Sequence, residues 1–163
     1  KKIRHLVINK PCGPGDKRDF ALRHAKGEIC AFIDDDAYPN KNWLKEAVRQ
    51  FKDNNIVALG GSGITPPEDN FMQQLGGLVY ESVFISWGFQ ERFVIGKKKR
   101  VYDWPAYNLL VRTKILKEVG GYGNFFYGGE DTFLCLKLIE KGKIVYEPKA
   151  FVYHHRRPLL SHI

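Results

Sequence analysis

The sequence contains little cysteine and no long apolar run. Its three cysteines, Cys12, Cys30 and Cys135, lie far apart, and none belongs to a CxxC motif. This spacing argues against a disulfide scaffold and a zinc finger, and it favours a reducing compartment, which we expect to be the cytoplasm. Because no stretch of about 18 apolar residues is present, the sequence predicts no membrane-spanning helix.

Acidic residues are also in deficit. The 163 residues include 26 Lys and Arg against 18 Asp and Glu, which gives a formal net charge of 26 − 18 = +8. This excess favours anionic partners, such as nucleotide phosphates or an anionic membrane surface. Aromatic residues do not alternate with basic ones as they do in nucleic-acid readers, so we expect no nucleic-acid partner.

The composition is globular, and strand patterns alternate with helix patterns. A hydrophobic share of 44% over residues 1–163 suits a single domain with a real core. Apolar runs at 29–33 and 56–59 predict strands, and the apolar stripe in 44–51 predicts a helix between them. This alternation predicts an α/β fold with a mixed, mainly parallel sheet flanked by helices.

Other segments are less regular. Residues 3–8 and 106–111 are short apolar runs that predict strands. The stretch 71–96 has helical spacing interrupted by a Gly-Gly pair, and it carries many aromatic residues. The basic run 97–100 follows it, and such a run is most often a solvated loop, with a membrane-surface patch as the sharper interpretation.

Three consecutive carboxylates, Asp34, Asp35 and Asp36, follow the predicted strand 29–33. In open α/β sheets, ligands bind beyond the carboxyl ends of the strands. Carboxylate oxygens suit Mg²⁺ or Mn²⁺, and such a metal can hold a diphosphate. The alternative is an acidic turn that caps the next helix. Since three adjacent like charges repel one another, the metal site is the favoured interpretation.

Three further motifs are weaker when each is taken alone. Residues 128–131 (GGED) precede a predicted helix; a carboxylate there could act as a general base, but a helix cap is the simpler interpretation. Residues 154–157 (HHRR) could complete a metal site and bind phosphate, but a polar strand end is simpler. The Gly-rich turn at 13–18 could lie near an anion, but it lacks the spacing of a P-loop.

Taken in order, these motifs resemble those of family 2 glycosyltransferases, which have the Rossmann-like GT-A fold. The matching stretches are 16–37 (DKRDFALRHAKGEICAFIDDDA), 108–121 (NLLVRTKILKEVGG), 129–131 (GED) and 154–157 (HHRR). Four motifs in the same order are more specific than any one of them. The chain starts near what would be the third strand of such a core. The resemblance therefore implies a catalytic-core fragment that lacks the first βαβ portion.

The resemblance implies a metal and nucleotide site. Asp36 would bind a divalent metal, Mn²⁺ or Mg²⁺, with Asp34 and His154 as further ligands. His155 is the second choice for the imidazole ligand. Asp34 or Asp35 would also lie near the ribose of the donor nucleotide.

The resemblance also implies catalytic and donor-binding residues. Asp131 would be the catalytic base, with Glu130 as its neighbour or substitute. Arg18 would lie near the donor nucleotide, and Arg157 or Arg18 would add positive charge beside the leaving diphosphate.

The resulting prediction is an inverting, metal-dependent glycosyltransferase with a nucleotide-sugar donor, for which a UDP-sugar is the first expectation. Its acceptor would be a carbohydrate or a lipid-linked molecule, in polysaccharide or glycolipid synthesis at the cytoplasmic face of a membrane. The aromatic stretch 71–93 and its basic tail would contact the acceptor or the membrane. Two alternatives remain: a nucleotidyltransferase, which would release pyrophosphate, and a non-catalytic module that binds nucleotide or sugar without turnover.

Overall fold

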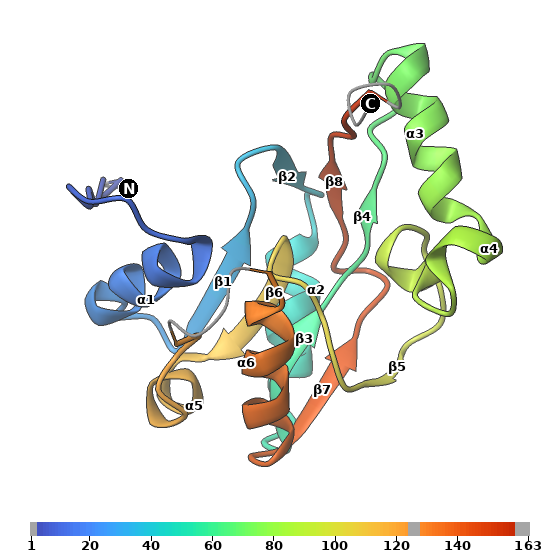
Figure 1. The fold of residues 1–163 in the computed structure, drawn as a ribbon. Coiled ribbons are helices and arrows are strands. Elements are labelled where there is room, and N and C mark those ends of the chain that lie inside the picture. The colour runs from blue at the N-terminus through green and yellow to red at the C-terminus, as the bar shows by residue number, and fades with distance from the viewer. Residues whose placement is uncertain (1–2, 124–127, 159–163) are drawn as a thin grey trace.

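The computed structural model describes residues 3–123 and 128–158 (Figure 1). Its elements in chain order are α1 (Pro14–His24), β1 (Ile29–Ile33), β2 (Ala37–Pro39), α2 (Trp43–Gln50), β3 (Ile56–Gly60), β4 (Gly63–Ile64), α3 (Phe71–Glu81), α4 (Val83–Ser86), the 3-10 turn η1 (Gln90–Arg92), β5 (Lys99–Val101), β6 (Asn108–Arg112), α5 (Thr113–Glu118), α6 (Glu130–Ile139), β7 (Lys143–Tyr146) and β8 (Val152–His154).

A mixed five-stranded sheet in the order β1-β6-β3-β7-β5 forms the centre of the fold. The α/β class and the mixed sheet flanked by helices are confirmed. Strands β1, β3 and β7 run in one direction, but β6 lies antiparallel between β1 and β3, and β5 is antiparallel at the edge. Three of the five strands thus share one direction. Within the described part of this sheet, however, β3 and β7 are the only neighbours that are parallel, and the other three pairs of neighbours are antiparallel.

Helices cover both faces of this sheet, with α6 in front and α2 behind in Figure 1. Strand β6 shows the two-sided burial most clearly. Its side chains Leu109 and Val111 belong to the cluster beneath α5 and α6, whereas Leu110 between them belongs to the cluster beneath α2. This is the alternation that a strand buried on both faces requires.

A second, three-stranded sheet in the order β2-β8-β4 positions the candidate site. Strand β2 begins directly after the three aspartates, and it pairs antiparallel with β8 so that Ala37 faces His154. Two motifs that are far apart in the sequence, the aspartate run and the histidine pair, are thereby brought together by backbone pairing alone.

Helix α3 is continuous through Gly76 and Gly77, where the sequence pattern suggested an interruption. A Cβ atom at Gly77 would lie 2.2 Å from the Thr65 Oγ1 atom. The glycine therefore permits close approach of the helix to the chain that follows β4. Within the described ranges, we find no helix that is both long and apolar enough to cross a bilayer.

The strand predicted at residues 3–8 is wrong. The segment has no regular secondary structure, and it pairs with no strand in the described part of the chain. The Ile3 and Val7 side chains are 97% and 61% exposed. Without burial or ladder hydrogen bonds, nothing offsets the entropy cost of fixing this backbone as a strand.

A buried amide joins the two sheets. Asn108, at the start of β6, is fully buried, and its Oδ1 accepts a hydrogen bond from Trp43 Nε1 at 2.8 Å. Its Nδ2 donates to the carbonyl of Ala150 at 2.8 Å and to that of Ser62 at 3.3 Å. This one side chain thus connects α2 and β6 to the segments that lead into β4 and β8.

We expect the substitution Asn108→Ala to lower the free energy of unfolding by about 3 kcal/mol, because it leaves the Trp43 N–H and the Ala150 carbonyl buried without this partner. Urea unfolding followed by circular dichroism measures the change. Asn54→Ala is the matched control, since Asn54 is exposed on a turn. Equal unfolding midpoints for the two variants would show that the buried amide contributes little.

Candidate active site

The three aspartates occupy the turn between β1 and β2, at the carboxyl end of β1 as predicted. The Ala37 N–H donates to the Asp34 carbonyl at 3.2 Å, which closes the turn. The His155 N–H donates to the Asp36 carbonyl at 3.0 Å, which ties the turn to the end of β8. The backbone therefore fixes where these carboxylates stand.

Asp34, Asp36 and His154 form a group that could hold a metal ion. Each offers a ligand atom, and these atoms all lie within 4.8 Å of one another. The closest pair is His154 Nε2 and Asp36 Oδ1, which are 2.9 Å apart. Carboxylate oxygens with one imidazole nitrogen suit Mn²⁺, so the donor set fits the divalent metal that the sequence motif implies.

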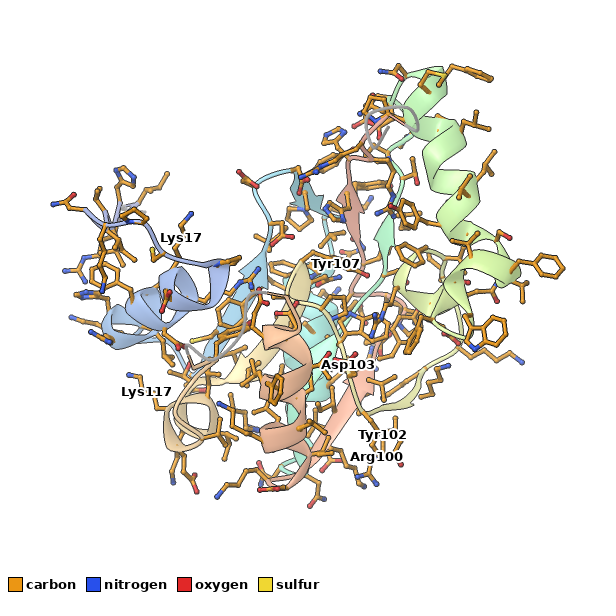
Figure 2. The ribbon with its side chains drawn as sticks, in the orientation of Figure 1. Lys17, Arg100, Tyr102, Asp103, Tyr107 and Lys117 are labelled. Carbon is orange, nitrogen blue, oxygen red and sulfur yellow. The ribbon has the colours of Figure 1, made fainter. Side chains whose placement is uncertain are left out.

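The geometry distinguishes between the two histidines. His155 turns away from the aspartate run and pairs through Nδ1 with Asp69. His154 stacks on Tyr107, the residue before β6, with ring centroids 5.0 Å apart, and Tyr107 is labelled in Figure 2. Burial lowers the pKa of His154, and the neighbouring Arg156 guanidinium lowers it further, against the opposing effect of Asp36. The neutral imidazole, which is the form that binds metals, is therefore favoured.

Asp131 lies in the first turn of α6. The helix begins after Gly129, whose φ of 96° is in the left-handed region that favours glycine. The Asp131 Oδ2 atom accepts a hydrogen bond from the Ala106 N–H at 2.9 Å, and Oδ1 lies 3.5 Å from Arg18 Nη1. Burial raises the pKa of Asp131, and the Ala106 N–H and Arg18 oppose this rise. A carboxylate with a raised pKa in a partly buried position suits a general base.

Arg18 connects the aspartate run to the start of α6. It projects from α1, and its guanidinium lies 3.2 Å from Asp34, 3.7 Å from Glu130 and 3.5 Å from Asp131. The Glu130 side chain also accepts a hydrogen bond from the Gly128 N–H, so this carboxylate is held at the helix start. The structure thus gathers motifs from three separate parts of the sequence around one cation.

Two residues that the sequence predicted for the site, Asp35 and Arg157, lie outside the group around Arg18 and His154. The Asp35 and Arg157 side chains are exposed, and neither makes an ion pair within the described ranges. The arginine beside His154 is Arg156, which is buried and faces His154 Nδ1 at 3.4 Å. The contacts predicted for Asp35 and Arg157 with the donor therefore stay predictions.

Sequence reasoning missed two supporting groups. One is Asp69, whose carboxylate accepts a hydrogen bond from the Arg156 N–H at 3.2 Å as well as facing His155. The other is the Ala106 N–H beneath Asp131. The position of a backbone N–H cannot be read from the side chains of a sequence, and Asp69 belongs to no recognisable motif in its polar loop. Neither group could therefore be found from the sequence.

Comparison with known proteins agrees with this arrangement. The family model for glycosyl transferase family 2 matches residues 1–120. The pre-mycofactocin glycosyltransferase of Mycobacterium tuberculosis (strain CDC 1551 / Oshkosh) is 28% identical over 149 residues, which cover 91% of this chain and 31% of that protein. The chain thus spans about a third of the length of this relative.

Two solved structures share the fold. TarS 1-349 of Staphylococcus aureus, in complex with UDP-GlcNAc, has a TM-score of 0.65 and 22% identity, and the match covers 96% of this chain and 42% of that chain. The mannosyltransferase PcManGT of Pyrobaculum calidifontis, in complex with GDP-Man and Mn²⁺, has a TM-score of 0.62 and 18% identity, with coverages of 94% and 39%. These likenesses show the predicted GT-A fold. Because the family model matches well over half of its residues, the chain belongs to glycosyltransferase family 2.

Proposed function

We propose that this chain forms the core of a metal-dependent, inverting glycosyltransferase that uses a nucleotide-sugar donor. The observation that carries the proposal is the convergence of Asp34, Asp36 and His154 beside the Arg18–Asp131 pair. Two fold relatives support the donor class, since one is bound to UDP-GlcNAc and the other to GDP-Man and Mn²⁺. A UDP-sugar is our first expectation for the donor.

Asp34, Asp36 and His154 would hold the divalent cation, Mn²⁺ or Mg²⁺. When bound, such a cation neutralises charge on a diphosphate and so favours its departure as a leaving group. The neutral state favoured at His154 leaves a nitrogen lone pair available for this role. The exposed Asp35 and Arg157 lie at the ends of the same two segments, where they would contact the ribose and the diphosphate of the donor.

Asp131 would act as the base. The Ala106 N–H occupies its Oδ2 atom, so Oδ1, which lies 3.5 Å from Arg18 Nη1, would take the proton from the acceptor hydroxyl. That hydroxyl oxygen then bonds to the anomeric carbon while the bond to the diphosphate oxygen breaks, and the leaving group keeps the electron pair. A single displacement of this kind inverts the anomeric configuration. Arg18 lowers the pKa of Asp131 and so favours its ionised form before the proton transfer, against the larger effect of burial.

The proposed acceptor is a hydroxyl of a carbohydrate or of a lipid-linked molecule at the cytoplasmic face of a membrane, in polysaccharide or glycolipid synthesis. The net charge of +8 supports a location beside anionic surfaces. Pyrophosphate as the released product would instead identify a nucleotidyltransferase, and binding without product release would identify a non-catalytic module.

We expect Asp131→Asn to lower turnover by about 10³-fold while donor affinity changes by less than about twofold, because the amide keeps the size of the side chain and its oxygen can still accept from the Ala106 N–H, but it takes up no proton. Nucleoside diphosphate release from UDP-sugars with a panel of hydroxyl acceptors measures turnover, and calorimetry measures donor binding. Glu130→Gln is the matched control, and it should retain most of the activity. Full turnover in Asp131→Asn would remove this residue from the role of base.

Asp36→Ala should weaken the Mn²⁺-dependent binding of a nucleoside diphosphate by at least about tenfold, because it removes one carboxylate from the proposed metal site. Calorimetric titration of UDP, GDP and dTDP, with and without Mn²⁺, measures this loss. Asp53→Ala is the control, because it removes the same charge from an exposed turn before β3 that has no proposed role in binding. An equal affinity of wild type and Asp36→Ala would contradict the metal assignment.

A further inference from the structure

A large apolar surface lies on α3 and α4. Of the seventeen large hydrophobic residues that are exposed in the described chain, nine fall between residues 71 and 95. We define the α3–α4 face by six of these residues, which are Phe71, Leu78, Val83, Phe84, Ile85 and Trp87; Tyr80, also on α3, is left out because its ring faces Arg156. The Phe84 and Trp87 side chains are 90% and 83% exposed. An exposed hydrophobic patch of this kind marks a surface that contacts another apolar partner.

Helix α3 is oriented opposite to an ordinary surface helix. Its polar side chains face the protein: Gln73 Nε2 donates to the Arg156 carbonyl at 2.9 Å, and Gln74 donates to the carbonyl of Pro66. Phe71 and Leu78, two helical turns apart, are 78% and 62% exposed. A solvent-facing helix usually turns its polar side outward, so the exposed apolar side of α3 indicates a further apolar partner.

Trp87 adds an independent observation. Among the described residues it is the only one other than glycine with a positive φ, at 38°. A bulky side chain is rarely found in this region of backbone conformation. The chain adopts it at the end of α4, where the indole is held away from the core. Tryptophan is enriched where an apolar body meets water, as at a membrane interface.

The basic residues in the segment that follows α4 favour an anionic lipid surface as the partner of this face. Residues 71–90 contain no Lys or Arg, and the full stretch 71–100 contains five Lys and Arg against two Glu. The basic run 97–100, which leads into β5, is exposed, and Arg100 is labelled in Figure 2. Within it Lys98 donates to Gln50, Lys99 pairs with Glu91, and the Arg100 guanidinium lies 5.1 Å from the Tyr102 ring, so all three charges stay at the surface. An anionic bilayer offers both apolar chains for the α3–α4 face and negative headgroups for this run.

We propose that the α3–α4 face docks on an anionic lipid bilayer. Phe84 and Trp87 insert at the level of the headgroups and the upper acyl chains, and Lys97 and Arg100 contact the anionic headgroups. This docking does not depend on the donor chemistry.

The docked face is connected to the candidate active site through Arg156. Its guanidinium lies 5.8 Å and 5.3 Å from the rings of Tyr80 and Phe93, and its Nη1 faces His154. Docking therefore places the active-site strand β8 beside the membrane. In the case of a lipid-linked acceptor, an inference that rests on the proposed function, the hydroxyl would lie at the level of the bilayer surface.

Tryptophan fluorescence tests the docking directly. The chain has three tryptophans, and Trp43 and Trp104 are only 7% and 3% exposed, so a change in emission on adding vesicles reports on Trp87. With vesicles of phosphatidylcholine and phosphatidylglycerol, we expect a blue shift and co-sedimentation of the full chain, both weakened by salt. Vesicles of phosphatidylcholine alone should give much weaker binding.

Two pairs of variants identify the surface. The double variant Phe84→Ser/Ile85→Ser keeps the fluorescent reporter and should reduce partitioning by at least about tenfold. Its control, Leu44→Ser/Val48→Ser, removes two exposed apolar side chains from α2 and should leave partitioning unchanged. Lys97→Gln/Arg100→Gln should reduce binding to anionic vesicles, whereas Lys41→Gln/Lys45→Gln, on the α2 side, should not.

Three results would overturn the docking proposal. They are no binding of the wild type to anionic vesicles, equal binding by Phe84→Ser/Ile85→Ser, and a self-association in sedimentation equilibrium that this variant abolishes. The last result would assign the face to a contact between copies. The same variant should bind nucleotide with wild-type affinity, so a failure of the docking and a failure of the transferase assignment are distinguishable.

Discussion

Charge balance around Arg18 is the constraint on which the candidate active site depends. Asp34, Glu130 and Asp131 stand around one guanidinium, and Asp36 completes the acidic edge beside an imidazole that favours its neutral form. Carboxylates at such separations repel one another, so the arrangement leaves negative charge that a further cation would neutralise. The same cluster would therefore attract a metal ion, and within it burial raises the pKa of Asp131 while the Ala106 N–H and Arg18 oppose that rise.

Backbone pairing supplies the rigidity that this balance requires. The turn that carries the aspartates is closed at both ends, by β1 in the large sheet and by β2 in the small one. Strand β8 holds His154 in fixed register with this turn, and the Ala106 N–H holds Asp131 through a hydrogen bond to its Oδ2 atom. The side chains of the candidate site stand mostly at the ends of regular elements, which limits their motion relative to one another.

Much of this was predictable from the sequence, and the failures have physical reasons. The aspartate run after an apolar strand and the carboxylates before a helix carry their own local signals, so both were placed correctly. The choice of Arg156 over Arg157 beside His154 depends on which face of the chain is buried, and two neighbouring arginines look alike in a sequence. The antiparallel insertion of β6 was not visible either, because an apolar strand does not encode the direction of its neighbours.

The order of strands in the large sheet has a consequence for how the chain acquires its structure. Strands β1 and β3 come from the first half of the sequence, yet among the described residues each pairs only with β6 or β7 from the second half. During synthesis, these pairings therefore form only after the late strands emerge. Such non-local topology slows folding and exposes aggregation-prone surface on nascent chains, so this domain is expected to depend on chaperones before its last strands leave the ribosome.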